Sequence, residues 1–329
     1  MGFELREDED TAERIRSYFK SKGGNMPENN LKQAMLPVGG TVFENNHGTA
    51  PGAALEKNGK CVIILPGPPG ELAPMFNESV RGFLKKYSDG AIVSHTVNII
   101  GMGESSVAEE IEDMFDAKNP TVAPYAKSGE VRLRITAKAE TADEADKMCA
   151  PVVDEICSRL GDVVYGTDMN SIEERVVALL KEKGKKIATA ESCTAGYIPK
   201  RLTDIPGASE VFECGIVSYS NDIKTKLLGV SLKTLDTYGA VSEQTAREMA
   251  LGAKHVSGAD IAISTTGLAG PGGDGVLPGG LSFAAVTDGE RTVVEKIVTG
   301  HENDREYNRY VTASRALNLA RLMLEEKIK

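Results

Sequence analysis

The sequence predicts an α/β protein built from more than one domain, and three observations support this fold class. At 329 residues, of which 41% are hydrophobic, the chain is long enough for two or three domains with apolar cores. After residue 168, apolar strands alternate with helical patterns, which indicates an α/β sheet whose functional loops lie at the strand ends. Residues 91–168 read as strand, helix, hairpin and helix, which predicts a small α+β unit.

Composition excludes several classes of function. The formal net charge of −10 repels phosphate backbones and anionic lipids, so neither nucleic acid nor membrane is an expected partner. The five cysteines form no C-x-x-C pair, and their odd number leaves at least one thiol unpaired, which fits a reducing cytoplasm. The first residues lack the apolar stretch of a signal peptide, and no run approaches the roughly 18 apolar residues of a membrane span. A soluble cytoplasmic protein is expected.

Residues 53–65 predict two short strands joined at Asn58-Gly59, because this dipeptide accepts the positive φ values of a tight hairpin turn. The following segment, LPGPPGEL, contains three prolines and two glycines. Proline fixes its own backbone and donates no N–H, so the segment predicts a rigid turn from strand to helix.

The α+β unit contains one glycine-rich turn, Gly101-Met102-Gly103-Glu104, which resembles a glycine loop of RNA-binding modules. Glu104 stands where a phosphate would lie, so a structural role is the better interpretation. The helix predicted after this turn carries four apolar residues at helical spacing: Val107, Ile111, Met114 and Phe115. The alternation in VRLRITAKA then predicts a strand.

A third unit opens with a helix that Ser171 and Glu174 cap as a capping box and that Gly184 ends. Its strands are predicted in KKIATA, CGIVSYS, ADIAISTTG and LSFAAVTDG. The last helix begins near Asn303 and carries a core-facing apolar stripe of Tyr310, Ala313, Leu317, Ala320 and Leu324.

In KKIATAESCTAG the strand is expected to end near Ala190, which places Glu191, Ser192 and Cys193 at the first turn of the next helix. Unpaired backbone N–H groups there would stabilise an oxyanion forming beside Ser192. A serine at this position is also a common helix cap, so both interpretations stay open.

A nucleophilic serine needs a base, and none of the four histidines lies in a recognisable triad setting. Tyr219 and Lys224 follow the next strand, and a lysine in a partly dry cleft can lose its charge and accept the serine proton. Taken singly, they read as a strand-end tyrosine and a surface lysine. Short-chain oxidoreductases also use Ser, Tyr and Lys, but their Tyr and Lys lie four apart on one helix, whereas here they are five apart across a turn.

The third loop, STTGLAGPGGDG, has five glycines and a proline in residues 267–275, so backbone N–H groups can approach a ligand closely. Gly270, Gly272 and Gly275 match G-x-G-x-x-G. The match does not predict a dinucleotide site, because a loop and a strand follow where a helix is needed and Asp274 would face the pyrophosphate.

Together, AESCTAG, YSNDIK and STTGLAGPGG resemble the competence/damage-inducible protein A (CinA) family in order and spacing. Residues 169–329 look like that family's C-terminal nicotinamide-nucleotide amidohydrolase domain, a three-layer α/β domain. The resemblance implies hydrolysis of the carboxamide of nicotinamide mononucleotide to nicotinate mononucleotide and ammonia. It implies that Ser192 is the nucleophile, that Tyr219 and Lys224 activate it, and that Cys193 is the rival nucleophile.

The resemblance also implies the remaining site residues and partners. Arg305 and Arg309 match basic positions that hold phosphate. The amidase is expected to need no cofactor or metal and to act on a small nucleotide as a homodimer. The substrate-binding residues implied are Glu191, Cys193, Thr194, Thr266, Gly267, Ala269, Gly270, Arg305 and Arg309.

The motifs NNLKQAMLP, NNHGTAPG and LPGPPGEL make residues 1–90 similar to the back part of the family's molybdopterin-binding-like domain, and residues 91–168 to its KH-like unit. Family members have a strand-helix run and a glycine-rich loop with Asp residues ahead of the position of residue 1. The ADP-ribose pyrophosphatase activity linked to that domain, and its divalent metal, are therefore not expected here. The alternative function is a nucleotide-binding or regulatory module without turnover.

Two smaller departures from the family pattern lie beside Ser192. Ala195 stands where a second glycine is common, and Pro199 is expected to kink or delay the helix.

Overall fold

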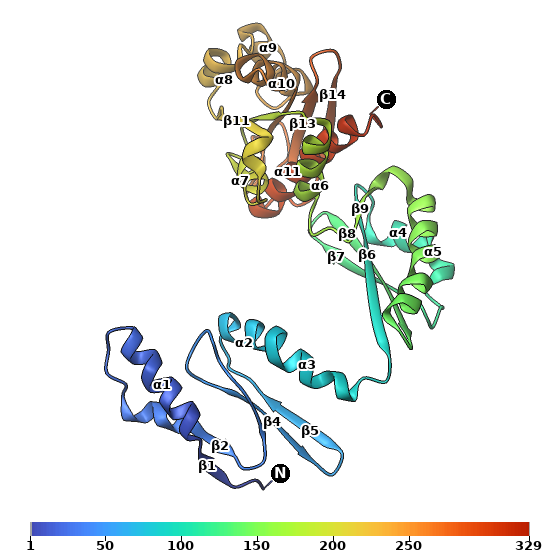
Figure 1. Cartoon of the computed structure of the whole chain (residues 1–329). Helices are drawn as coiled ribbons and strands as arrows, with labels where there is room; N and C mark the ends of the chain where they lie inside the picture. Colours follow the sequence, from blue (N-terminus) through green and yellow to red (C-terminus); the bar gives the residue numbers. More distant parts are fainter. Residues whose placement is uncertain (1, 329) are drawn as a thin grey trace. The chain divides into compact units, whose positions relative to one another are not determined.

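The computed structural model describes residues 2–328, and the chain divides into two compact units, Met1–Asp89 and Gly90–Lys329 (Figure 1). Each unit is described by itself. No helix in the described residues has the length and apolar character that crossing a bilayer requires.

The first unit contains a two-stranded sheet, β1-β2, and a three-stranded antiparallel sheet, β3-β4-β5. Asn58 and Gly59 have φ values of 52° and 72°, which confirms the predicted hairpin. The rigid turn before α2 is also confirmed. The elements are β1 (Leu5–Glu7), α1 (Glu9–Ser21), η1 (Glu28–Ala34), β2 (Met35–Pro37), β3 (Thr41–Phe43), β4 (Gly52–Lys57), β5 (Lys60–Ile64), α2 (Pro69–Met75), η2 (Phe76–Val80), α3 (Arg81–Leu84) and η3 (Lys85–Tyr87).

The second unit begins with a four-stranded antiparallel sheet in the order β7-β8-β6-β9, packed against α4 and α5. The helix after the glycine turn is shorter than predicted, because α4 ends at Glu110 and a separate turn follows. The elements are β6 (Ala91–Ile100), α4 (Glu104–Glu110), η4 (Glu112–Met114), β7 (Thr121–Lys127), β8 (Glu130–Ala139), α5 (Ala142–Leu160), η5 (Gly161–Val163) and β9 (Val164–Thr167).

A five-stranded sheet in the order β11-β10-β12-β13-β14 forms the rest of the second unit. β10 pairs in parallel with β11 and β12, while β13 and β14 are antiparallel, and the hairpin strand β14 is an element that the sequence patterns did not predict. The elements are α6 (Ile172–Lys183), β10 (Ile187–Glu191), α7 (Tyr197–Thr203), η6 (Ala208–Glu210), β11 (Phe212–Val217), α8 (Asn221–Leu228), α9 (Leu232–Tyr238), α10 (Glu243–Ser257), β12 (Ile261–Gly267), β13 (Leu281–Thr287), β14 (Thr292–Val298) and α11 (Arg305–Leu324).

Helices cover both faces of this sheet, which makes a three-layer α/β domain (Figure 1). Helices α6, α7 and α11 pack with one face, and α8, α9 and α10 belong to the other. Gly184 ends α6 with a φ of 59°, as predicted. The capping box is only half formed, since Ser171 accepts the N–H of Glu174 but the carboxylate of Glu174 accepts from Asn170.

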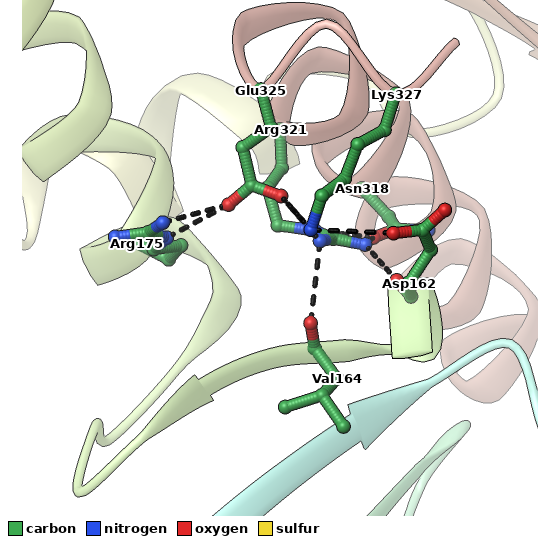
Figure 2. Close-up of polar contacts among 7 residues, drawn as sticks. All are labelled: Asp162, Val164, Arg175, Asn318, Arg321, Glu325 and Lys327. Carbon is green, nitrogen blue, oxygen red and sulfur yellow. Dashed lines mark hydrogen bonds and ion pairs between the residues drawn. The ribbon is translucent and has the colours of Figure 1, made fainter. Parts of the chain in front are cut away.

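Within the second unit, α11 joins the antiparallel sheet to the α/β domain. The Arg321 guanidinium is 0% exposed and donates to the carbonyls of Asp162 at 2.7 Å and Val164 at 3.3 Å, and Glu325 balances its charge (Figure 2). Farther up the helix, a Cβ added at Gly101 would lie 3.1 Å from Arg315 Nη1. The glycine turn at 101–104 therefore packs against this chain's own helix, in keeping with the structural role predicted for it.

Candidate active site

Two parallel strands bring the proposed nucleophile and base to one edge of the five-stranded sheet. Ser192 directly follows β10, and Lys224 lies in the first turn of α8, which Ser220 caps three residues after β11. Glu191 pairs with Val217 at the ends of the two strands. Because parallel strands end at the same edge, residues 32 positions apart in the sequence meet there.

The Lys224 Nζ makes three polar contacts and faces little solvent. It lies 3.0 Å from Ser192 Oγ, 2.9 Å from the carbonyl oxygen of Ser218 and 3.1 Å from that of Tyr219. The lysine side chain is 1% exposed and the serine 9%. Burial lowers the pKa of Lys224 below its ordinary value, because removing an ammonium ion from water is unfavourable.

Tyr219 takes a different part from the one the sequence predicted. Its main-chain carbonyl contacts Lys224, whereas its hydroxyl accepts a hydrogen bond from Arg305 at 3.4 Å. The side chain is 61% exposed. The structure therefore places the tyrosine hydroxyl toward the arginine and not between the serine and the lysine.

Ser192 and Lys224 open onto a cavity of about 330 Å³, here called the serine cavity. Six of the predicted substrate-binding residues line it: Cys193, Thr266, Gly267, Ala269, Gly270 and Arg305. Arg305 also donates to the carbonyl of Gly270 at 2.7 Å, which fixes the glycine-rich loop to the start of α11. The cavity has further lining residues that sequence reasoning missed, since small and apolar residues carry no chemical signal: Ala240, Val241, Leu268, Pro271, Gly272 and Gly273.

The structure corrects the assignment of Glu191 and Thr194 as substrate-binding residues. Both are 0% exposed and neither lines the serine cavity. The Thr194 hydroxyl lies 2.6 Å from that of Thr265, and the Glu191 carboxylate accepts the N–H of Ile198 at 3.1 Å. Their polar atoms are thus used inside the protein.

The expected helix mouth beside Ser192 is also wrong. α7 begins only at Tyr197, and residues 192–196 form an irregular turn. The delay fits Pro199, because proline is tolerated in a first helical turn but not in a helix interior. Ala195 adopts a φ of 48°, a left-handed conformation that explains why glycine suits this position.

Arg309 lies beside the serine cavity and does not line it. It donates to the carbonyl of Thr194 at 2.6 Å and, with Tyr197, Arg305 and Glu306, lines a neighbouring cavity of about 280 Å³. Arg305 borders both cavities. The two arginines therefore offer guanidinium groups along one side of the site.

Cys193 is a poor nucleophile in this setting. Its side chain is 6% exposed, and burial raises the pKa of the thiol to about 12. Because the thiolate is the reactive form of cysteine, very little of the reactive species exists near neutral pH. Ser192 is the better candidate.

Fold and site together define a protein with a three-layer α/β domain that carries a buried serine–lysine pair beside a glycine-rich loop. Sequence comparison is more specific. Residues 169–324 match the CinA C-terminal domain, and residues 94–166 match the damage-inducible protein CinA KH domain. The chain belongs to the CinA family.

Relatives of similar sequence span most of this chain. A Clostridium beijerinckii protein is 52% identical over 303 residues, which cover 91% of this chain and 74% of that protein. A CinA-like protein from Desulfovibrio desulfuricans is 45% identical over 324 residues, 98% of this chain and 76% of that protein. The crystal structure of the competence/damage inducible protein CihA from Agrobacterium tumefaciens is 38% identical, covers 47% of this chain and 93% of its own, and has a TM-score of 0.45.

Proposed function

We propose that the protein hydrolyses the carboxamide of nicotinamide mononucleotide to nicotinate mononucleotide and ammonia. The arrangement around Lys224 Nζ carries the proposal. A neutral lysine amine has two N–H groups and one lone pair. Because the carbonyls of Ser218 and Tyr219 accept the two N–H groups, the lone pair is left for the hydroxyl proton of Ser192.

The proposed reaction is acyl transfer through Ser192. The serine Oγ bonds to the amide carbon while Lys224 accepts the serine proton, and the amide N–H of Cys193 is the candidate donor to the oxyanion. The C–N bond then breaks as Lys224 passes the proton to the leaving nitrogen, which departs as ammonia. Water attacks the acyl ester, gives its proton to Lys224 and releases the carboxylic acid. These steps use only protein groups and water.

Three features support a nucleotide amide as the substrate. The chain belongs to the CinA family, and the loop at 266–273 brings closely packed backbone to the serine cavity. Arg305 and Arg309 flank the site, and guanidinium groups bind phosphate through paired hydrogen bonds. The phosphate of the substrate is therefore proposed to lie toward these two arginines.

Ammonia release from nicotinamide mononucleotide by the full chain tests the proposal. Wild type is expected to release ammonia, and Ser192→Ala and Lys224→Ala are expected to release none above background while keeping the wild-type circular dichroism spectrum. If the folded wild type binds the nucleotide and releases no ammonia, the proposal fails and a binding or regulatory module replaces it.

A further inference from the structure

Glu191 is a buried carboxylate that the proposed reaction does not use. It is the last residue of β10 and directly precedes Ser192. Its side chain is 0% exposed and does not line the serine cavity. A buried carboxylate is unfavourable unless the protein compensates it, so its contacts indicate what it does.

The carboxylate of Glu191 gathers the backbone amides that follow the nucleophile turn, defined as residues 192–196. Oε2 accepts the N–H of Ile198 at 3.1 Å, and the amides of Gly196 and Tyr197 also hydrogen-bond the carboxylate. These amides open α7 and have no partner within the helix. The other oxygen, Oε1, has no hydrogen-bond partner among residues 2–328.

The nucleophile turn needs such a support. Ala195 and Gly196 have φ values of 48° and 87°, so two successive residues are left-handed. For alanine this conformation is unfavourable, because its Cβ crowds the following carbonyl oxygen. An acceptor that binds successive amides stabilises a turn of this kind.

The main chain of Glu191 also reaches the lysine side of the pair. Its carbonyl accepts the N–H of Ser218 at 2.8 Å, and the carbonyl of Ser218 accepts from Lys224 at 2.9 Å. One residue thus contacts the segment that holds the nucleophile and the segment that holds the base.

We infer that Glu191 is a positioning residue for the nucleophile: its carboxylate, acting as an acceptor for the amides of residues 196–198, holds the nucleophile turn in the shape that points Ser192 Oγ at Lys224. The inference rests on the proposed function for the identity of the reaction. It concerns the reach of the carboxylate oxygen and not its charge.

The test measures how fast a fluorophosphonate probe labels Ser192 in the full chain, followed by intact mass, with Ser192→Ala as the blank. This readout does not depend on the substrate. Two substitutions separate reach from charge. Glu191→Gln keeps an acceptor oxygen at the position of Oε2 and places its amide nitrogen at the unpartnered Oε1, whereas Glu191→Asp keeps the charge and withdraws it by one methylene.

Glu191→Gln is expected to label within about fivefold of wild type, and Glu191→Asp about 10²-fold more slowly, the usual effect of a misplacement near 1 Å. Thr189→Val is the matched control, since Thr189 lies on the same strand, is buried and has no side-chain hydrogen bond among the described residues. It is expected to label at the wild-type rate. Circular dichroism and melting temperature show that each variant is folded.

Equal labelling of Glu191→Asp and Thr189→Val would overturn the inference, and so would a Glu191→Gln rate as low as that of Glu191→Asp, because charge would then matter more than reach. The proposed function fails separately. If wild type releases no ammonia while the labelling order holds, Glu191 still positions Ser192 and only the substrate is wrong.

Discussion

Two cavities of this protein differ in how their polar groups meet solvent. In the serine cavity, Lys224 is 1% exposed and Ser192 9%. In the first unit, a cavity of about 470 Å³, here called the N-terminal cavity, is lined by Asp8, Arg14, Glu44 and Asn46 among others. There the side chains of Arg14 and Glu44 pair with each other while staying 43% and 64% exposed.

The difference shows that burial, more than cavity size, makes a polar side chain reactive. A dry environment lowers the pKa of Lys224 and so provides a base. Water solvates the exposed pair in the N-terminal cavity, and pairs of this kind contribute only about 0–1 kcal/mol. We therefore expect substitutions in the serine cavity to change chemistry and those in the N-terminal cavity to change little.

The largest expected effect comes from removing the base. Lys224→Ala and Lys224→Arg should each slow ammonia release by about 10²–10⁴-fold, because arginine keeps the charge but cannot lose its proton. Initial rates at saturating nicotinamide mononucleotide measure this. An active Lys224→Arg would show that the charge, and not proton acceptance, is what the site requires.

The pH dependence should be the next largest effect. Lysine accepts the serine proton only when it is neutral, and burial places its pKa below the ordinary value of 10.5. The rate should therefore rise about tenfold per pH unit below that pKa and level off above it, at a midpoint under 10.5. A kcat profile from pH 6 to 10 tests this, and a rate that falls as pH rises would contradict it.

Cys193→Ala should have a much smaller effect than Ser192→Ala. With the thiol pKa raised to about 12 by burial, the cysteine acts as a small apolar residue. Ammonia release should fall by less than about tenfold, since so little thiolate is present. The reverse pattern, an inactive cysteine variant beside an active serine variant, would transfer the nucleophile to Cys193.

Arg14→Ala in the N-terminal cavity should have the smallest effect. It breaks the exposed pair with Glu44 and should change the free energy of unfolding by at most about 1 kcal/mol. Labelling of Ser192 should not change. A double-mutant cycle with Glu44→Gln in urea measures the pair, and a coupling above about 2 kcal/mol would show that exposure understates it.

Local patterns predicted the elements that local chemistry controls. The Asn58-Gly59 hairpin and the end of α6 at Gly184 follow from φ preferences, which a residue largely sets by itself. The helix α1 was missed although Asp8 caps it by accepting the N–H of Thr11 at 2.8 Å, a signal that the sequence contains. Strand β14 was missed because its residues do not alternate clearly between buried and exposed.

In the candidate site, motifs predicted position better than environment. They place Ser192, Tyr219 and Lys224 just after two strands, and the parallel pairing of β10 with β11 confirms that both loops reach one edge. They did not show that Glu191 turns inward, because whether a side chain faces the cavity or the protein depends on the turn that follows it.

The sequence alone determined which residues stand at the strand ends, since hydrophobic periodicity and turn chemistry act over a few neighbouring positions. Only the tertiary structure decided that Lys224 loses its water, that its partners are two carbonyls and Ser192, and that the Tyr219 hydroxyl faces Arg305. The physical reason is that desolvation depends on packing from segments far apart in the chain, and it is desolvation that shifts a pKa.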